Sequence, residues 1–156
     1  MLDYTLPLAL HVLAAIIWVG GMFFAHMAVR PSVLALAPPE RLPLMRAIMG
    51  RFFAWVWVAI ITLLATGYGV LLLGYRGGFG GGGPYVDAMQ GIGGVMMALF
   101  LYLFFAPWQS FKNAVAAENF PKAAGHMARI RWIIGVNLVL GLITAAIGAI
   151  GAFVVG

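Results

Sequence analysis

Long apolar runs alternate along the chain with short segments that hold most of the charged residues and prolines. About 20 consecutive apolar residues are enough for one helix to cross the hydrocarbon core of a bilayer. Four runs of that length are present, and each is typical of a membrane-spanning helix. They cover residues 5–29, 52–73, 88–106 and 132–155. We therefore predict an all-α, polytopic membrane protein, in which residues 1–156 form one four-transmembrane-helix bundle.

The segments between the runs predict how the spans are connected. Arg30 and Pro31 are expected to end the first helix, because proline interrupts helical hydrogen bonding. The Pro38-Pro39 pair predicts a turn, followed by a short interfacial helix before the second span. Residues 109–132 predict an amphipathic helix before the fourth span. The glycine-rich segment 74–83 lacks the Gly-Lys-Ser/Thr ending of a phosphate-binding loop and is interpreted as a connector.

Composition supports the membrane class, and charge orients the bundle. Of the 156 residues, 64% are hydrophobic and 8% are charged, whereas soluble domains carry about 25% charged residues. The chain has no cysteine, which excludes disulfides and thiolate metal sites. Eight of the nine basic residues flank the first-to-second and third-to-fourth connections, which the positive-inside rule assigns to the cytoplasm. We predict that both termini lie on the outer (periplasmic) side, and that the net charge of +5 reflects topology rather than nucleic-acid binding.

Two of the three histidines lie in the first span, where ionisable side chains are costly. His11 shares a helical face with small residues and with Trp18. His26 lies fifteen residues further on, roughly 22 Å along the helix, so the two imidazoles cannot bind one centre. An ionisable side chain inside a membrane is by default a hypothesis for a functional site. The alternative is a hydrogen bond that joins two helices.

Each histidine has candidate partners at its own level of the membrane. Near the outer surface His11 could meet Asp87 and Met89, a donor set that suits copper, with the thioether favouring Cu(I). Near the inner surface His26 and His126 come from different helices, and such a pair could hold the iron of haem b.

Other polar and soft side chains have structural interpretations. Trp18 could stack on a planar cofactor, although packing is the commoner role of a buried tryptophan. Met22, Met96 and Met97 are expected to fill gaps in the core. Asn137 is expected to form a hydrogen bond with a neighbouring helix. No paired carboxylates or nucleophile–base spacing appears in the sequence.

Three stretches of sequence resemble one membrane-protein family. LALHVLAAIIWVGGMFFAHMAVRP resembles the opening of CopD-like copper-resistance membrane proteins, with a histidine, a tryptophan seven residues on, a Gly-Gly pair and an Arg-Pro exit. RFFAWVWVAIITLLATGYGVLL and ARIRWIIGVNLVLGLITAAIG are similar to later helices of the same family. The resemblance implies copper handling in the inner (cytoplasmic) membrane of a bacterium. A more distant similarity, to HemJ-type protoporphyrinogen oxidases, implies b-type haem and redox chemistry.

These observations leave three functions open. The favoured one is a copper-binding protein for copper transport or homeostasis, with His11, Asp87 and Met89 as metal ligands. The alternative is a haem b redox protein or electron carrier, which would use His11 or the His26 and His126 pair. The third is a membrane scaffold or subunit that uses the small-residue face of the fourth span to pair with a second copy of itself or with a larger partner. That face comprises Gly135, Gly141, Ala145, Gly148, Ala149 and Ala152.

Overall fold

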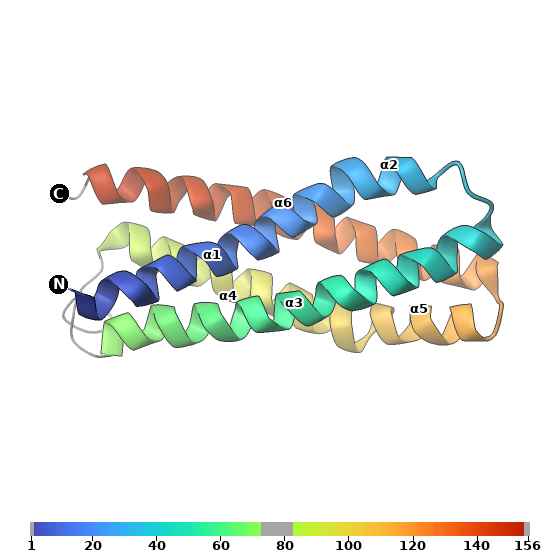
Figure 1. Cartoon of the computed structure of the whole chain (residues 1–156), viewed down its shortest axis with the longest axis horizontal. Coiled ribbons are helices and arrows are strands. Elements are labelled where there is room, and N and C mark those ends of the chain that lie inside the picture. The colour runs from blue at the N-terminus through green and yellow to red at the C-terminus, as the bar shows by residue number, and fades with distance from the viewer. Residues whose placement is uncertain (1, 73–82, 155–156) are drawn as a thin grey trace.

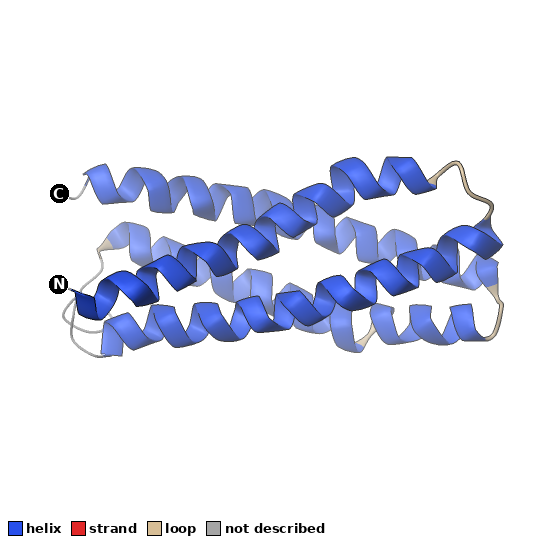
Figure 2. Ribbon diagram, in the orientation of Figure 1, coloured by secondary structure: helices blue, strands red, loops and turns tan. Residues whose placement is uncertain are grey.

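The structure, a computed structural model, describes residues 2–72 and 83–154, together with the side chains of residues 5–72 and 83–151. Every regular element within these ranges is a helix, which confirms the all-α prediction (Figure 2). In the same ranges, four helical stretches are long and apolar enough to cross a membrane. They are Thr5–Val33, Pro38–Leu72, Pro84–Ala116 and Phe120–Gly151. Apart from Gly83, the glycine-rich connector lies outside the described residues.

The first helix does not end at Arg30-Pro31 as the sequence predicted. Helix α1 (Leu2–Phe24) continues through a π-helical segment, η1 (Ala25–Val29), into α2 (Arg30–Val33). A π-helical turn contains an extra residue and changes the hydrogen-bond pattern. Pro31 follows this wider turn, in which the N–H of Arg30 donates to the carbonyl of Ala25 five residues earlier. The chain therefore passes through the proline without a turn.

The second span belongs to one continuous helix, α3 (Pro38–Leu72). The expected interfacial helix around residues 42–49 is its first part rather than a separate element. Pro38 and Pro39 open this helix, which is where proline is best tolerated. With 35 residues α3 is roughly 52 Å long, and the hydrocarbon core is about 30 Å thick. Helix α3 is therefore much longer than the hydrocarbon core is thick.

The third and fourth spans are separated by two breaks. Helix α4 (Pro84–Phe105) is followed by Ala106. Beyond this break the side-chain Nε2 of Gln109 donates to the backbone carbonyl of Phe104 at 3.0 Å. Helix α5 (Pro107–Ala116) follows, and α6 (Phe120–Val154) begins after a turn. In this turn Glu118 adopts a positive φ of 52° and the Asn119 side chain accepts from the N–H of Lys122. This cap divides the single amphipathic helix that the sequence predicted into α5 and the start of α6.

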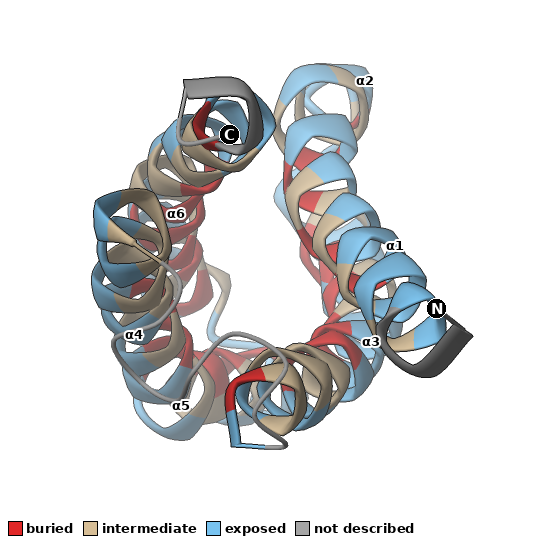
Figure 3. Ribbon diagram, turned by 90° about the vertical axis from the view of Figure 1, so that its left-hand side faces the viewer, coloured by how far each residue is buried: buried red, intermediate tan, exposed pale blue. Residues whose placement is uncertain are grey.

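The long helices surround a common core, and both termini lie at one end of the bundle (Figures 1 and 3). The connectors at residues 34–37 and 117–119 lie together at the opposite end, with α2 and α5 (Figure 1). Aromatic rings fill the core toward that end, where the Phe53 ring centroid lies 5.7 Å from that of Phe100 and 5.0 Å from that of Trp108. Large apolar side chains cover the outside of every span. Examples are Ile16, Trp55, Val95 and Ile150. This exposed apolar surface is suited to the interior of a lipid bilayer.

Candidate functional site

His11 joins α1 to α3 near the end of the bundle that holds the termini. Its Nδ1 lies 2.9 Å from Oγ1 of Thr66, and this hydroxyl donates to the carbonyl of Thr62 at 2.6 Å. The Thr66 oxygen therefore accepts from Nδ1–H, which leaves the lone pair of the imidazole on Nε2. Gly67 permits the close approach, because an ideal Cβ at that position falls 3.1 Å from Cε1 of His11. The sequence did not identify Thr66, although a threonine inside an apolar span was a signal.

The other two predicted ligands lie on α4 and contact a different helix. Asp87 is exposed in the first turn of α4. Met89 packs on α6, where an ideal Cβ at Gly148 falls 3.3 Å from its sulfur. No described contact joins either side chain to His11. Across the described residues, no three His, Cys, Asp or Glu side chains gather to hold a metal ion.

A second set of donors lies at mid-bundle, where α1, α4 and α6 meet. Met96 and Val19 both approach Gly141, and an ideal Cβ there falls 3.1 Å from Cε of Met96 and 2.8 Å from Cγ2 of Val19. Helices α1 and α6 run in opposite directions (Figure 1). Met22, three residues after Val19, and Asn137, four residues before Gly141, therefore lie at about the same level of the bundle. Met22, Met96 and Asn137 are 2%, 3% and 2% exposed.

Asn137 forms the interhelical hydrogen bond that the sequence predicted. Its Nδ2 donates to the Met96 carbonyl at 3.1 Å. Its Oδ1 is buried and has no hydrogen-bond partner in the described part of the chain. Trp18 packs beside this region, with its ring centroid 6.3 Å from that of Phe100 in an edge-on arrangement. Two thioethers and an unpartnered amide oxygen thus lie in the centre of the bundle.

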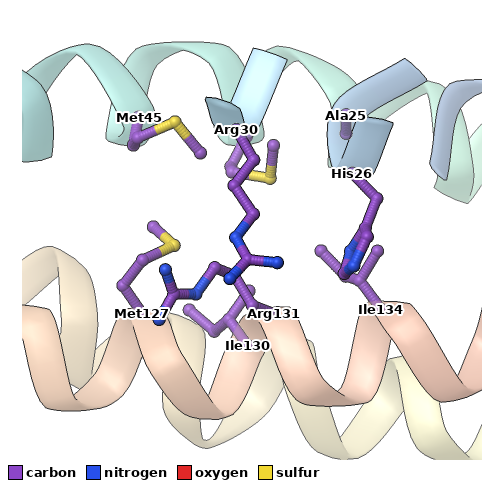
Figure 4. A pocket seen from close by; sticks show the side chains of 9 residues that line it. Ala25, His26, Arg30, Met45, Met127, Ile130, Arg131 and Ile134 are labelled. Carbon is purple, nitrogen blue, oxygen red and sulfur yellow. The ribbon is translucent and has the colours of Figure 1, made fainter. Parts of the chain in front are cut away.

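A third group of side chains lies toward the connector end (Figure 4). A cavity of about 20 Å³ is lined by His26 and Arg30 from the first helix, by Met45 and Met49 from α3, and by α6. The lining residues from α6 are Met127, Ile130, Arg131 and Ile134. The guanidinium groups of Arg30 and Arg131 point into the same space (Figure 4). The sequence did not reveal this arginine pair, since the residues are about 100 positions apart.

His126, the predicted partner of His26, does not line this cavity. The His26 ring lies over Gly135, where an ideal Cβ falls 3.5 Å from its Cε1. His126 lies nine residues before Gly135 on α6, roughly 13 Å along the helix, and its Nε2 is buried without a partner. Haem ligation by the two histidines stays a prediction.

The comparisons with known proteins give one match. Residues 46–151 match the family model of copper resistance protein D, CopD. The match spans more than half of the chain. This chain belongs to the CopD family. No curated protein matches it. No solved structure does either.

The CopD match covers α4, α5 and most of α3 and α6. It therefore includes Met89, Met96 and Asn137, and it begins after His11 and Met22. CopD membership and four apolar spans make this a multi-pass membrane protein of the copper-resistance type. Membership associates the protein with copper.

Proposed function

We propose that this CopD protein binds Cu(I) as a cargo ion inside its helix bundle, for copper transport or homeostasis. The observation that carries the proposal is the mid-bundle group of Met22, Met96 and Asn137. Thioethers are soft ligands that favour Cu(I), and a monovalent ion is the least costly metal charge to hold in a low-dielectric interior. The Oδ1 of Asn137 has no hydrogen-bond partner among the described residues and supplies a further oxygen donor.

Further methionines extend this group toward both ends of the bundle. Met89 lies seven residues before Met96 on α4, roughly 10 Å nearer the termini. Met45, Met49 and Met127 are buried toward the connectors. A weakly bound Cu(I) ion could exchange between successive thioethers along this series. The interior of the bundle thus offers soft donors over most of its length.

At the outer end we propose His11, Asp87 and Met89 as the ligands that receive copper. The hydrogen bond from Nδ1–H to Thr66 supports a role for His11, because metal-binding histidines commonly donate their second N–H to a fixed acceptor. It orients the ring and leaves Nε2 as the coordinating atom. Asp87 and Met89 lie on α4, which packs against α6, whereas His11 lies on α1. This site would therefore form by movement of α4 toward α1.

The same proposal places the protein in the inner membrane of a bacterium with both termini in the periplasm. The basic residues support this orientation. Residues Arg30, Arg41, Arg46, Arg51, Lys112, Lys122, Arg129 and Arg131 belong to the half of the bundle that carries the connectors (Figure 1). The positive-inside rule assigns that half to the cytoplasm.

The deciding experiment is an anaerobic titration of the detergent-purified protein with Cu(I) against a competing chelator. We expect stoichiometric binding, and we expect Met22→Leu and Met96→Leu each to weaken it by about tenfold, since leucine preserves volume but removes a ligand. Met27→Leu is the matched control, because Met27 is 58% exposed on the outside of the same helix. Equal affinity in all variants would refute the mid-bundle site.

An absorption spectrum of the same preparation tests the haem alternative. Under the copper proposal, neither the oxidised nor the dithionite-reduced protein has a Soret band. A Soret band with sharp reduced α and β bands would favour haem b instead. Cu(I) flux into proteoliposomes then separates transport from storage, because only a transporter equilibrates the ion across the bilayer.

A further inference from the structure

A groove of about 590 Å³ runs between the end of the first helix and α6. Arg30 and Arg131 lie at its polar end, and Trp132, Val136, Val139 and Leu140 continue it along α6. Its lining contains no carboxylate. The groove opens beside Trp132 and Val139, whose side chains are 68% and 57% exposed on the outer surface of the bundle. A ligand could therefore enter it from the membrane.

The polar end of the groove carries positive charge that the described part of the protein does not neutralise. Arg30 and Arg131 point into the same space from opposite walls (Figure 4). Nε of Arg30 is buried, and no described residue forms a hydrogen bond with it. Two close guanidinium groups repel each other, and a buried unpaired N–H group carries a desolvation penalty. One bound anion would relieve both costs.

The position of the groove indicates the kind of anion. Trp132 marks the interfacial level on α6, where aromatic side chains are typically found. The two arginines lie at this level, and Val136, Val139 and Leu140 extend from it toward the middle of the membrane. A small free anion would use only the arginines. A lipid would place its phosphate on the arginines and an acyl chain along the apolar residues.

The π-helical segment η1 lies directly beside this groove. Its His26 lines the groove, and Arg30 follows immediately after it. The extra residue of the π turn rotates α2 relative to a continued α-helix, and such turns frequently occur at functional sites. Gly135 lies beneath His26 and leaves this part of the groove without a side chain.

We propose that this groove binds an anionic phospholipid, with the lipid phosphate between Arg30 and Arg131 and one acyl chain along α6. Basic sites between transmembrane helices on the cytoplasmic side are suited to anionic headgroups. The proposal does not rest on the mid-bundle copper site, because Met22, Met96 and Asn137 are absent from the groove lining. The two proposals meet only at the adjoining cavity, which Arg30 and Arg131 line together with Met45, Met49 and Met127. Phosphatidylglycerol is the probe, and phosphatidylcholine is the zwitterionic reference.

Native mass spectrometry of the purified full-length protein, titrated with each lipid, measures the affinities. We expect phosphatidylglycerol to bind more tightly than phosphatidylcholine. We expect Arg30→Gln and Arg131→Gln each to lower phosphatidylglycerol affinity by about fivefold. Arg129→Gln is the matched control, because it removes the same charge from an exposed position two residues away on α6. Equal losses in Arg129→Gln and Arg131→Gln would show diffuse attraction and overturn the proposal.

Two further measurements separate the lipid from other ligands of the same groove. Gly135→Leu fills the groove without changing charge, and we expect it to weaken phosphatidylglycerol binding as well. It also provides the test if the arginine variants fail to fold. We expect inorganic phosphate at millimolar concentration not to displace the lipid. Displacement by phosphate would indicate a simple anion site, and haem absorption that is lost in Arg131→Gln would indicate a porphyrin. Either result would overturn the lipid assignment.

Discussion

At the scale of single residues, the function of a polar side chain in the membrane depends on the atom that it faces. His11 was interpreted from sequence as either a ligand or an interhelical hydrogen-bonding residue, and its geometry is compatible with both. Nδ1–H donates to the Thr66 hydroxyl oxygen, so the lone pair of the neutral ring is on Nε2. One imidazole can thus connect α1 to α3 and still bind a metal.

Thr66→Val tests whether this hydrogen bond supports both stability and binding. We expect the free energy of unfolding to fall by about 0.5–1.5 kcal/mol, because an interhelical hydrogen bond is lost while the shape is kept. We also expect weaker Cu(I) binding, since the ring loses its orientation. Thermal unfolding in detergent and the chelator titration measure the two effects.

Thr144→Val is the control for this substitution, because the Thr144 hydroxyl donates to the Leu140 carbonyl of its own helix and makes no interhelical hydrogen bond among the described residues. If Thr66→Val lowers stability but leaves copper affinity unchanged, His11 is a structural residue and not a ligand.

At the scale of elements, glycines set how closely the helices approach. The Gly20-Gly21 pair illustrates this, because the two adjacent glycines of α1 differ in the space that a Cβ atom would have. An ideal Cβ at Gly21 would overlap the Phe52 ring on α3, whereas at Gly20 nothing lies within 4 Å. Glycines on α6 act similarly, since Gly141, Gly148 and Gly151 receive side chains from α1 and α4. Much of the small-residue face of α6 is therefore packed against α1 and α4 of the same chain.

Gly21→Ala should separate α1 from α3, whereas Gly20→Ala should not. We expect Gly21→Ala to cost about 1–3 kcal/mol through overpacking against an aromatic ring. Gly20→Ala should be neutral or stabilising by up to about 1 kcal/mol, because alanine favours the helix. Thermal unfolding of both variants gives the comparison. Equal melting temperatures would contradict the α1–α3 packing described above.

Homo-oligomer formation through α6 stays a prediction, now restricted to the part of the face that the chain does not cover. Ala145 and Ala149 are exposed and remain available to a second copy.

At the scale of the whole molecule, the bundle is longer than the membrane and strongly asymmetric in charge. Helices α3 and α6 each have 35 residues, and the basic residues gather in the half with the connectors. Since both connectors lie at the same end, all four spans can satisfy the positive-inside rule together. The additional length of α3 and α6 lies at the connector end, where both helices pack against α5.

Reporter fusions test this orientation. A periplasmic alkaline phosphatase fused after residue 156 should be active, whereas the same enzyme inserted in the connector at residues 34–37 should be inactive. A cytoplasmic fluorescent protein at the two positions should give the reverse pattern. Phosphatase activity at the connector would show that the bundle is inserted the other way round.

The sequence alone determined the fold class, the four spans, the family and the charge asymmetry. Each of these depends on the composition of a segment by itself, because a span is stable in lipid when its own side chains are apolar. The family resemblance rested on the same segments, and the match over residues 46–151 confirms it.

The tertiary structure decided which side chains meet. Lipid and protein core are both apolar, so hydrophobic periodicity does not reveal which face of a span points inward. The rotation of each helix follows from local packing, such as Gly21 against Phe52 and Gly141 against Val19. These contacts pair His11 with Thr66 and bring Asn137 to the backbone carbonyl of Met96. The same packing brings Arg30 to Arg131, which no local pattern in the sequence could indicate.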